Sequence, residues 1–329
     1  MSISEEYISN LLVSSDLSSK LYEDAITRGM IGPVNIDNDI LSFTITYGYP
    51  LGNRISFIKQ TIKDHILLLD TVRSVKININ VSIESHAVQA GNQLIPGVKN
   101  IIAVASGKGG VGKSTTTVNL ALAVSSLGAR VGILDADIYG PSIPLMLGIS
   151  DKPESPDGKK IMPMIGHGLQ SNSIGFLIPR DEAMVWRGPM VTQALEQLLR
   201  QTAWNNLDYL FVDLPPGTGD IHLTLAQKVP LTGAIIVTTP QELATLDARK
   251  GLKMFQKVSV PILGVVENMS SYICPNCKHV ENIFGDGGGK VLSDEYQVDF
   301  LGSLPLNKKT REDSDNGIPS LISNADSVS

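Results

Sequence analysis

The sequence is poor in cysteine and contains no long apolar run. Only two of its 329 residues are cysteines, which excludes a fold held together by several disulfides. So few cysteines are typical of a protein from a reducing compartment. No apolar stretch approaches the roughly twenty residues that a membrane-spanning helix needs. The first residues also lack the basic start and apolar core of a signal peptide. We therefore expect a cytoplasmic protein with no membrane partner.

The chain also lacks an excess of basic charge. Its 27 Lys and Arg residues stand against 33 Asp and Glu residues, and the formal net charge is −6. This balance provides no broad basic surface for nucleic acid, so we expect no nucleic-acid partner. A chain of this length suffices for one large or two modest domains.

The first part of the chain mixes two hydrophobic periodicities. Residues near 1–30 and 54–70 carry apolar residues at helical spacing, whereas 39–47 and 75–81 alternate between apolar and polar residues. Helical spacing indicates amphipathic helices, and alternation indicates half-buried strands. Residues 1–86 are therefore predicted to form a small α/β domain.

The rest of the chain has a different pattern. Gly91, Pro96 and Gly97 mark residues 87–99 as a linker. From 100 to 329, continuous apolar runs alternate with glycine-rich turns and helical stretches, which predicts a doubly wound α/β domain with a mostly parallel sheet and a ligand site at the carboxyl ends of its strands. The predicted strands are 101–105, 131–134, 209–212, 234–237 and 262–266, and the clearest helices are 191–202 and 243–257.

A glycine-rich segment follows the first of these strands and fits the P-loop pattern G-x-x-x-x-G-K-[ST]. In such a loop, backbone N–H groups surround a polyphosphate, Lys113 reaches its terminal phosphates, and Ser114 can ligate Mg²⁺. The sequence therefore predicts a P-loop NTPase that binds ATP or GTP. The predicted nucleotide-binding positions of the loop are Gly107, Lys108, Gly109, Gly110, Val111, Gly112, Lys113, Ser114 and Thr115.

Carboxylates follow two further strands. Asp135 and Asp137 come directly after 131–134, although aspartates that merely cap a turn would look the same. Asp213 ends an apolar strand, as does the Walker B carboxylate that holds Mg²⁺ through water in P-loop enzymes. Gly217 and Gly219 follow, and their backbone freedom is typical of a switch that responds to a γ-phosphate.

Both cysteines lie in one segment, Cys274-Pro275-Asn276-Cys277. Two thiols at this spacing can bind one metal ion or two irons of a cluster. A [4Fe–4S] cluster or a tetrahedral zinc ion usually has four protein ligands, and a two-fold dimer would supply the pair twice. A structural zinc site, or an incomplete zinc set with His279, remains the alternative.

These motifs resemble the Mrp/ApbC-type iron–sulfur cluster carrier ATPases of the MinD/ParA group. The resemblance rests on the additional lysine of the loop, Lys108, and on the segments 134–142, Trp186-Arg187-Gly188-Pro189, 213–220, Glu267-Asn268-Met269-Ser270 and Cys274–Cys277. Members of this family often carry a small α/β domain ahead of the ATPase domain, which residues 1–90 resemble in length and order.

The resemblance implies a homodimer that binds ATP, Mg²⁺ and a labile [4Fe–4S] cluster, receives the cluster from a scaffold protein and delivers it to apo-proteins. It also implies that the catalytic residues are Lys113, Lys108 acting on the partner's phosphates, and Asp137 orienting the attacking water. Asp135 would lie near the Mg²⁺ shell, and Asn268 would read the adenine. The alternative is a MinD/ParA-like switch ATPase with a structural zinc knuckle.

Overall fold

The computed structural model describes residues 4–37, 39–69, 71–178 and 188–323. The chain forms two compact units. One comprises Met1–Glu84 with Ser126–Gly128, and the other comprises Ser85–Ser125 with Ala129–Ser329. Within the described ranges, no helix is both long enough and apolar enough to cross a bilayer.

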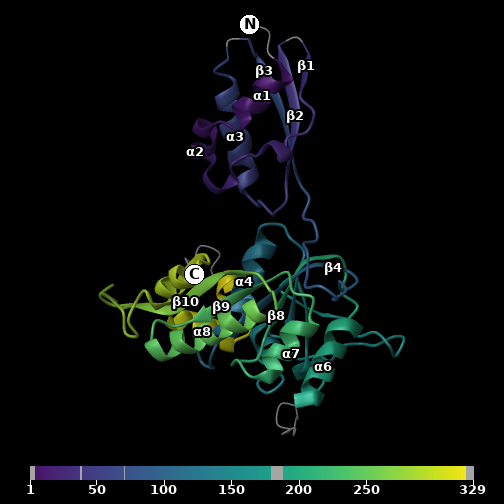
Figure 1. The fold of residues 1–329 in the computed structure, drawn as a ribbon, viewed down its shortest axis with the longest axis vertical. Coiled ribbons are helices and arrows are strands. Elements are labelled where there is room, and N and C mark those ends of the chain that lie inside the picture. The colour runs from purple at the N-terminus through teal and green to yellow at the C-terminus, as the bar shows by residue number, and fades with distance from the viewer. Residues whose placement is uncertain (1–3, 38, 70, 179–187, 324–329) are drawn as a thin grey trace. The chain divides into compact units, whose positions relative to one another are not determined.

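The smaller unit contains a three-stranded sheet packed against helices (Figure 1). Strand β2 (Ile40–Tyr47) pairs antiparallel with β1 (Asn35–Asp37) and parallel with β3 (Ser74–Val81). Every second residue of β2 is buried, which confirms the strand that the alternating pattern predicts. Apolar residues of the helices and strands share one core. The helices are α1 (Glu5–Leu12), α2 (Ser15–Leu21) and α3 (Arg54–Ile66).

The larger unit is built on a nine-stranded sheet in the order β11-β10-β9-β4-β8-β5-β7-β6, with β12 paired to β10. The pairs among β12, β10, β9, β4, β8, β5 and β7 are parallel, whereas β11 and β6 pair antiparallel. This confirms the predicted mostly parallel sheet. The strands are β4 (Val98–Ala105), β5 (Val131–Asp135), β6 (Met164–Gly166), β7 (Leu169–Ser173), β8 (Leu207–Asp213), β9 (Gly233–Thr238), β10 (Ile262–Ile273), β11 (Val280–Glu281) and β12 (Phe300–Leu306).

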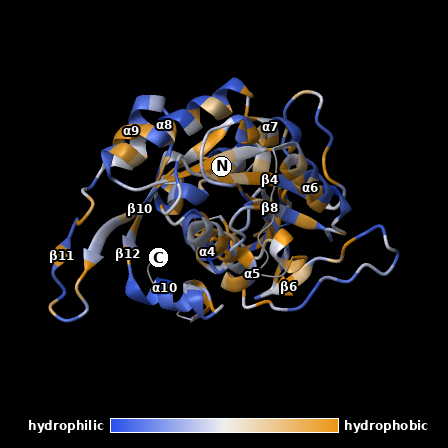
Figure 2. Ribbon diagram, turned by 90° about the horizontal axis from the view of Figure 1, so that it is seen from below, coloured by the Kyte–Doolittle hydropathy of each residue, from blue (hydrophilic) through white to orange (hydrophobic). Residues whose placement is uncertain are grey.

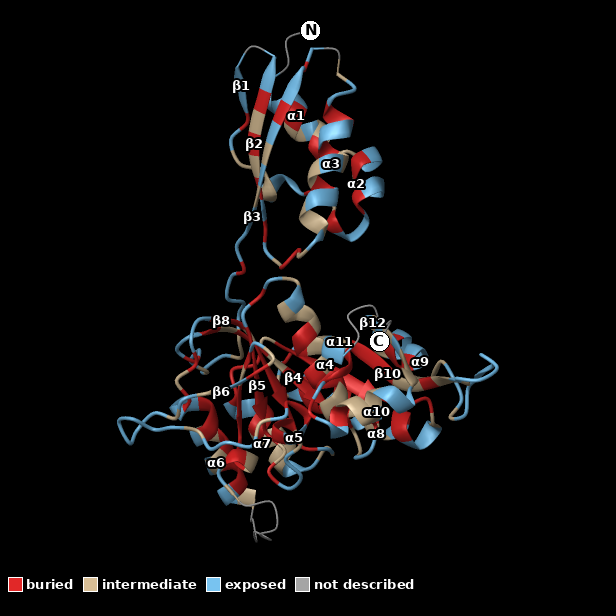
Figure 3. Ribbon diagram, turned by 180° about the vertical axis from the view of Figure 1, so that it is seen from behind, coloured by how far each residue is buried: buried red, intermediate tan, exposed pale blue. Residues whose placement is uncertain are grey.

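Helices cover both faces of this sheet, as a doubly wound fold requires. Figure 2 shows α6, α7, α8 and α9 on one face and α4, α5 and α10 on the other. The central strands β4, β5, β8 and β9 are almost wholly buried between these layers, and Figure 3 shows the buried residues gathered there. The helices are α4 (Lys113–Ser126), α5 (Ile143–Met146), α6 (Gly188–Gln201), α7 (Asp220–Lys228), α8 (Glu242–Lys257), α9 (Gly288–Tyr296), α10 (Lys308–Asp315) and α11 (Ser320–Ser323).

The sheet differs from the sequence prediction in several places, because β6, β7, β11 and β12 were not among the predicted strands and β10 is longer than predicted. Strand β10 continues to Ile273, well beyond the predicted end at 266. Strand β7 was not predicted, because its sequence Leu-Gln-Ser-Asn-Ser has no apolar run. Its polar side chains are nevertheless buried and paired: Asn172 Nδ2 donates to Thr202 Oγ1 at 2.6 Å. Of the family-like segment 186–189, Trp186 and Arg187 lie outside the described residues, and Gly188 begins α6.

Candidate functional site

The glycine-rich loop joins the end of β4 to the start of α4. Strand β4 is flanked by β8 and β9, so the loop lies at the carboxyl edge in the middle of the sheet. The chain turns directly from the strand into the helix, which begins at Lys113. The first N–H groups of α4 therefore point toward the loop, which is the arrangement that binds phosphates at helix N-termini.

Three glycines allow the loop to adopt this path. Gly110 and Gly112 have φ angles of +81° and +79°, a region that L-residues with side chains rarely adopt. A Cβ on Gly107 would lie 2.2 Å from the carbonyl carbon of Asp247 in α8. The loop is thus packed against a helix on the opposite side from α4, and only glycine fits that contact.

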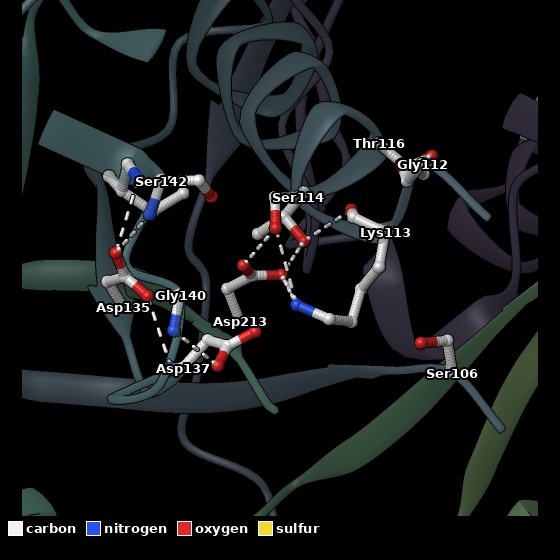
Figure 4. A network of polar contacts seen from close by, with 12 residues as sticks. Ser106, Gly112, Lys113, Ser114, Thr116, Asp135, Asp137, Gly140, Ser142 and Asp213 are labelled. Carbon is white, nitrogen blue, oxygen red and sulfur yellow. Dashed lines mark hydrogen bonds and ion pairs between the residues drawn. The ribbon is translucent and has the colours of Figure 1, made fainter. Parts of the chain in front are cut away.

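A polar network connects the loop to the end of β8 (Figure 4). Lys113 Nζ lies 2.7 Å from Asp213 Oδ1, and both side chains are buried. Ser114 donates its hydroxyl to Asp213 Oδ2 at 2.6 Å, and Thr117 donates to Asp213 Oδ1 at 2.8 Å. Lys113 Nζ also lies 3.3 Å from Ser114 Oγ. The lysine, the hydroxyl and the carboxylate that the sequence singled out therefore converge on one point. Thr117 was not predicted, because nothing distinguishes it among the neighbouring threonines.

Asp135 stands opposite Asp213 on the adjacent strand β5. Its carboxylate accepts N–H groups of Asp137, Ser142 and Ile143 at 3.1 to 3.2 Å and the Ser173 hydroxyl at 2.9 Å. Complete burial, followed by the charge of Asp213, raises the pKa of Asp135 to about 7, although the hydrogen bonds oppose the rise. With four donors already on its oxygens, this carboxylate holds the loop after β5 in place.

Asp137 occupies that loop, nearer to the lysine. Its Oδ1 accepts the Gly140 N–H at 3.2 Å. Burial raises the pKa of Asp137, and the charge of Lys113 opposes the shift. Figure 4 shows Asp137 beside Gly140 and Asp213, in the same polar site as Lys113.

A histidine that was not predicted fixes the segment after β8. His222 Nδ1 accepts the Gly219 N–H at 3.1 Å, and its Nε2 lies 2.9 Å from the Pro216 carbonyl oxygen. This pairing requires the proton on Nε2. Gly217 has a φ of +116°, and a Cβ there would lie 3.1 Å from the ring of His222. The imidazole therefore closes the segment 216–219 into a compact turn beside the loop.

A cavity of about 410 Å³ lies between α4 and the strands β10 and β12. It is lined by Thr115 and Asn119 of α4, by Asn268 of β10, and by Leu304 and Pro305 at the end of β12. Asn268 donates from Nδ2 to the Val111 carbonyl oxygen at 2.9 Å and accepts the Met269 N–H on Oδ1 at 2.9 Å. Apolar walls with a few amides suit a flat heteroaromatic ring.

The two cysteines lie at the turn between β10 and β11, which projects from the edge of the sheet (Figure 2). The Cys274 N–H donates to the His279 carbonyl, and the Lys278 N–H donates to the Cys274 carbonyl, each at 2.9 Å. Hydrogen bonds from the N–H groups of Cys277 and Asn276 lower the pKa of the Cys274 thiol. This is a tight knuckle whose thiolate is stabilised by backbone donors, as thiolate ligands need.

The knuckle supplies only two ligands of its own. Cys277 is exposed and Cys274 half-exposed. Among the residues that the structure describes, no group of three or more His, Cys, Asp or Glu side chains could hold a metal ion. His279, which the sequence offered as a third ligand, thus forms no such group with the cysteines.

Similarity to known proteins agrees with this combination of loop and knuckle. The family model of the NUBPL iron-transfer P-loop NTPases matches residues 97–329. An iron–sulfur cluster carrier protein of Haemophilus influenzae is 51% identical over 303 residues, covering 92% of this chain and 82% of that protein. One of Salmonella typhimurium is 50% identical over 291 residues, covering 88% of this chain and 79% of that protein.

A solved structure supports the same assignment. The nucleotide-binding protein of Archaeoglobus fulgidus, determined in complex with ADP, superposes with a TM-score of 0.60 and is 39% identical, covering 67% of this chain and 87% of that one. The cell division ATPase MinD of Pyrococcus furiosus, at a TM-score of 0.52 and 22% identity, shares the fold. The chain therefore belongs to the family of NUBPL iron-transfer P-loop NTPases.

Proposed function

We propose that this protein is an ATP-dependent carrier of iron–sulfur clusters. The observation that carries this proposal is that a P-loop with the Lys113–Asp213 ion pair and a solvent-accessible pair of thiols, the only thiols of the chain, occur in one unit. The names of the relatives at about half identity support the cluster as the cargo.

The nucleotide would enter with its phosphates in the loop and its base in the cavity beside Asn268. The phosphates would take the place of Asp213 as the partner of Lys113. Ser114 Oγ and Asp213 Oδ2, 2.6 Å apart, are adjacent hard oxygen donors and thus fit Mg²⁺. When bound there, Mg²⁺ offsets the phosphate charge. Asp137 would orient the attacking water, and the site would hydrolyse ATP.

Lys108 would complete the site of a second copy. Its backbone carbonyl is held by the Ser106 hydroxyl at 2.9 Å, which fixes the loop beneath the side chain. Gly107, immediately before it, packs on α8, where Leu243 and Leu246 are 64% and 47% exposed. Exposed leucines next to a loop cation suit a face that a second copy covers. We assign this face to a homodimer.

The dimer also explains the knuckle. A [4Fe–4S] cluster usually takes four cysteine ligands, and one chain supplies Cys274 and Cys277. Two copies related by a two-fold axis supply four. Ile273 and Val280, next to the knuckle, are 50% and 56% exposed, and they would provide an apolar surround for a cluster between the copies.

Cluster transfer to an acceptor tests the proposal. The protein would be loaded anaerobically with iron and sulfide, freed of excess reagents, and mixed with the apo form of an enzyme whose activity requires a [4Fe–4S] cluster. We expect the acceptor to gain activity, and the Cys274→Ala/Cys277→Ala double variant to transfer nothing. Equal activation by wild type and double variant would contradict the carrier function, because the iron would then be bound nonspecifically.

A further inference from the structure

Two adjacent residues of β10 hold the two ends of the segment that carries the cysteines. We call this segment, residues 269–287, the cysteine hairpin. Asn268 precedes it and contacts the glycine-rich loop. Glu267 is 1% exposed, and its carboxylate accepts the N–H groups of Gly287 and Gly289 at 3.2 and 2.5 Å, where the hairpin ends and α9 begins.

The two side chains have opposite surroundings because successive side chains of a strand point to opposite faces. Asn268 Nδ2 donates to the Val111 carbonyl at 2.9 Å, and a Cβ on Gly112 would lie only 2.1 Å from the same nitrogen. The amide therefore fills the space against the loop. Asn268 is thus in direct contact with the glycine-rich loop.

The strand is irregular immediately after this contact. Pairing of β10 with β12 is in register from Val266 to Asn268 and shifts before it resumes at Tyr272. Met269 has a φ of +57°, which is unfavourable for a residue with a side chain. Tyr272 and Ile273 then pair with Glu281 and Val280 of β11, and Cys274 follows directly. Bulges of this kind re-aim a strand, and this one lies between the loop contact and the knuckle.

We propose that Asn268 is a positioning residue that couples occupancy of the nucleotide cavity to the geometry of Cys274 and Cys277. The inference rests on the proposed function in one respect, namely that the base of a nucleotide enters the cavity that Asn268 lines. A base there competes with the Val111 carbonyl for the amide. The resulting shift of Asn268 passes through the bulge into the base of the hairpin.

Glu267 determines how the hairpin responds. Because its carboxylate anchors the outgoing end of the hairpin to α9, only the incoming end follows Asn268. Movement of one end relative to the other tilts the knuckle, whereas movement of both would only translate it. The cysteines would therefore change their orientation when nucleotide binds.

Alkylation of the cysteines tests this coupling directly. The reduced, metal-free protein contains no other thiols, so the rate of reaction with iodoacetamide reports on the knuckle alone. The rate would be measured with and without saturating AMPPNP and Mg²⁺. We expect nucleotide to change the wild-type rate by about fivefold or more, the lower end of typical coupling between sites.

Two asparagine variants, one inside the cavity and one outside it, test the coupling. Asn268→Asp keeps the size of the side chain but removes the donor, so its rate ratio with and without nucleotide should fall to about one. Asn92→Asp is the matched control, because Asn92 also donates to a backbone carbonyl, that of Gln227 at 2.8 Å, but does not line the cavity. It should keep the wild-type ratio at saturating nucleotide.

Hydrogen exchange of wild-type protein gives a second readout that does not depend on a variant. AMPPNP should change exchange at the amides of residues 272–273 and 280–281. The proposal is wrong if nucleotide changes neither the alkylation rate nor the hydrogen exchange of wild-type protein. It is also wrong if Asn268→Asp keeps the wild-type ratio of alkylation rates, or if both variants lose it. If nucleotide changes the alkylation rate of wild-type protein but the protein binds no cluster, the coupling stands and only the proposed function is refuted.

Discussion

Lys113 and Asp213 form a buried ion pair, with Nζ 2.7 Å from Oδ1 and side-chain exposures of 6% and 0%. The pair joins the start of α4 to the end of β8, and the hydroxyls of Ser114 and Thr117 complete the hydrogen bonds of the carboxylate. The lysine is thus held in place in the folded chain, with a partner that a phosphate can replace.

Removing this lysine should affect both function and stability. Lys113→Ala should lower ATP hydrolysis by about a hundredfold or more, as the loss of one charge-stabilising donor does elsewhere. It should also lower the free energy of unfolding by about 3 to 5 kcal/mol, because Asp213 is left charged and buried. Phosphate release and urea unfolding measure the two effects. The exposed Lys253 provides the control variant, Lys253→Ala. Normal hydrolysis by Lys113→Ala would exclude a role in the site.

Lys108 should act on the partner's nucleotide. Lys108→Ala and Lys113→Ala should each be nearly inactive, but a mixed dimer has one site with its own Lys113 and the partner's Lys108. Random exchange of equal amounts should therefore restore about a quarter of wild-type activity, since half of the dimers are mixed and each has one complete site. If Lys108 acted within its own chain, mixing would restore nothing.

Two glycines of the loop should differ in their tolerance of a methyl group. Gly110 has a positive φ but nothing within 4 Å of a Cβ, so Gly110→Ala should cost about 1 to 2 kcal/mol of backbone strain. Gly107→Ala would place its Cβ 2.2 Å from the α8 backbone and should cost distinctly more. Urea unfolding of nucleotide-free protein compares the two. Equal losses would mean that the contact between the loop and α8 is not as close as described.

The buried Asp135 should make stability depend on pH. Burial beside Asp213 raises its pKa to about 7, so the folded protein binds this proton more tightly than the unfolded chain, in which Asp titrates near pH 4. The contribution is complete below about pH 4 and is lost as the pH rises from about 4 to about 7. The free energy of unfolding should therefore fall over this range in wild type, and fall less in Asp135→Asn. Parallel pH curves for the two proteins would show that Asp135 is ionised throughout.

The strands of the larger unit were predictable where burial on both faces requires continuous apolar residues. Runs such as 209–212 and 234–237 lie within β8 and β9. Strand β7 was not predictable, because Ser171, Asn172 and Ser173 are fully buried but satisfied by partners distant in sequence, such as Asp135. The hydrophobic periodicity of a segment does not indicate such hydrogen bonds to residues distant in sequence.

The same limit applies to the site. The glycine pattern indicates the loop, and the ends of strands indicate the carboxylates, because both depend on local chain geometry. The bond from Asn268 to Val111 and the anchoring of Gly287 by Glu267 depend on how β10 lies against other elements. The end of β10 was missed for a related reason: after Val266 the sequence becomes polar, although the strand continues through the bulge at Met269.

The most direct measurement is anaerobic reconstitution with iron and sulfide, followed by determination of iron, sulfide and mass of the isolated species. We expect a dimer that carries about four irons and four sulfides, and the Cys274→Ala/Cys277→Ala double variant should bind none. A monomer that carries the same cluster, a double variant that retains it, or a chain that binds only zinc would contradict a cluster held between two knuckles.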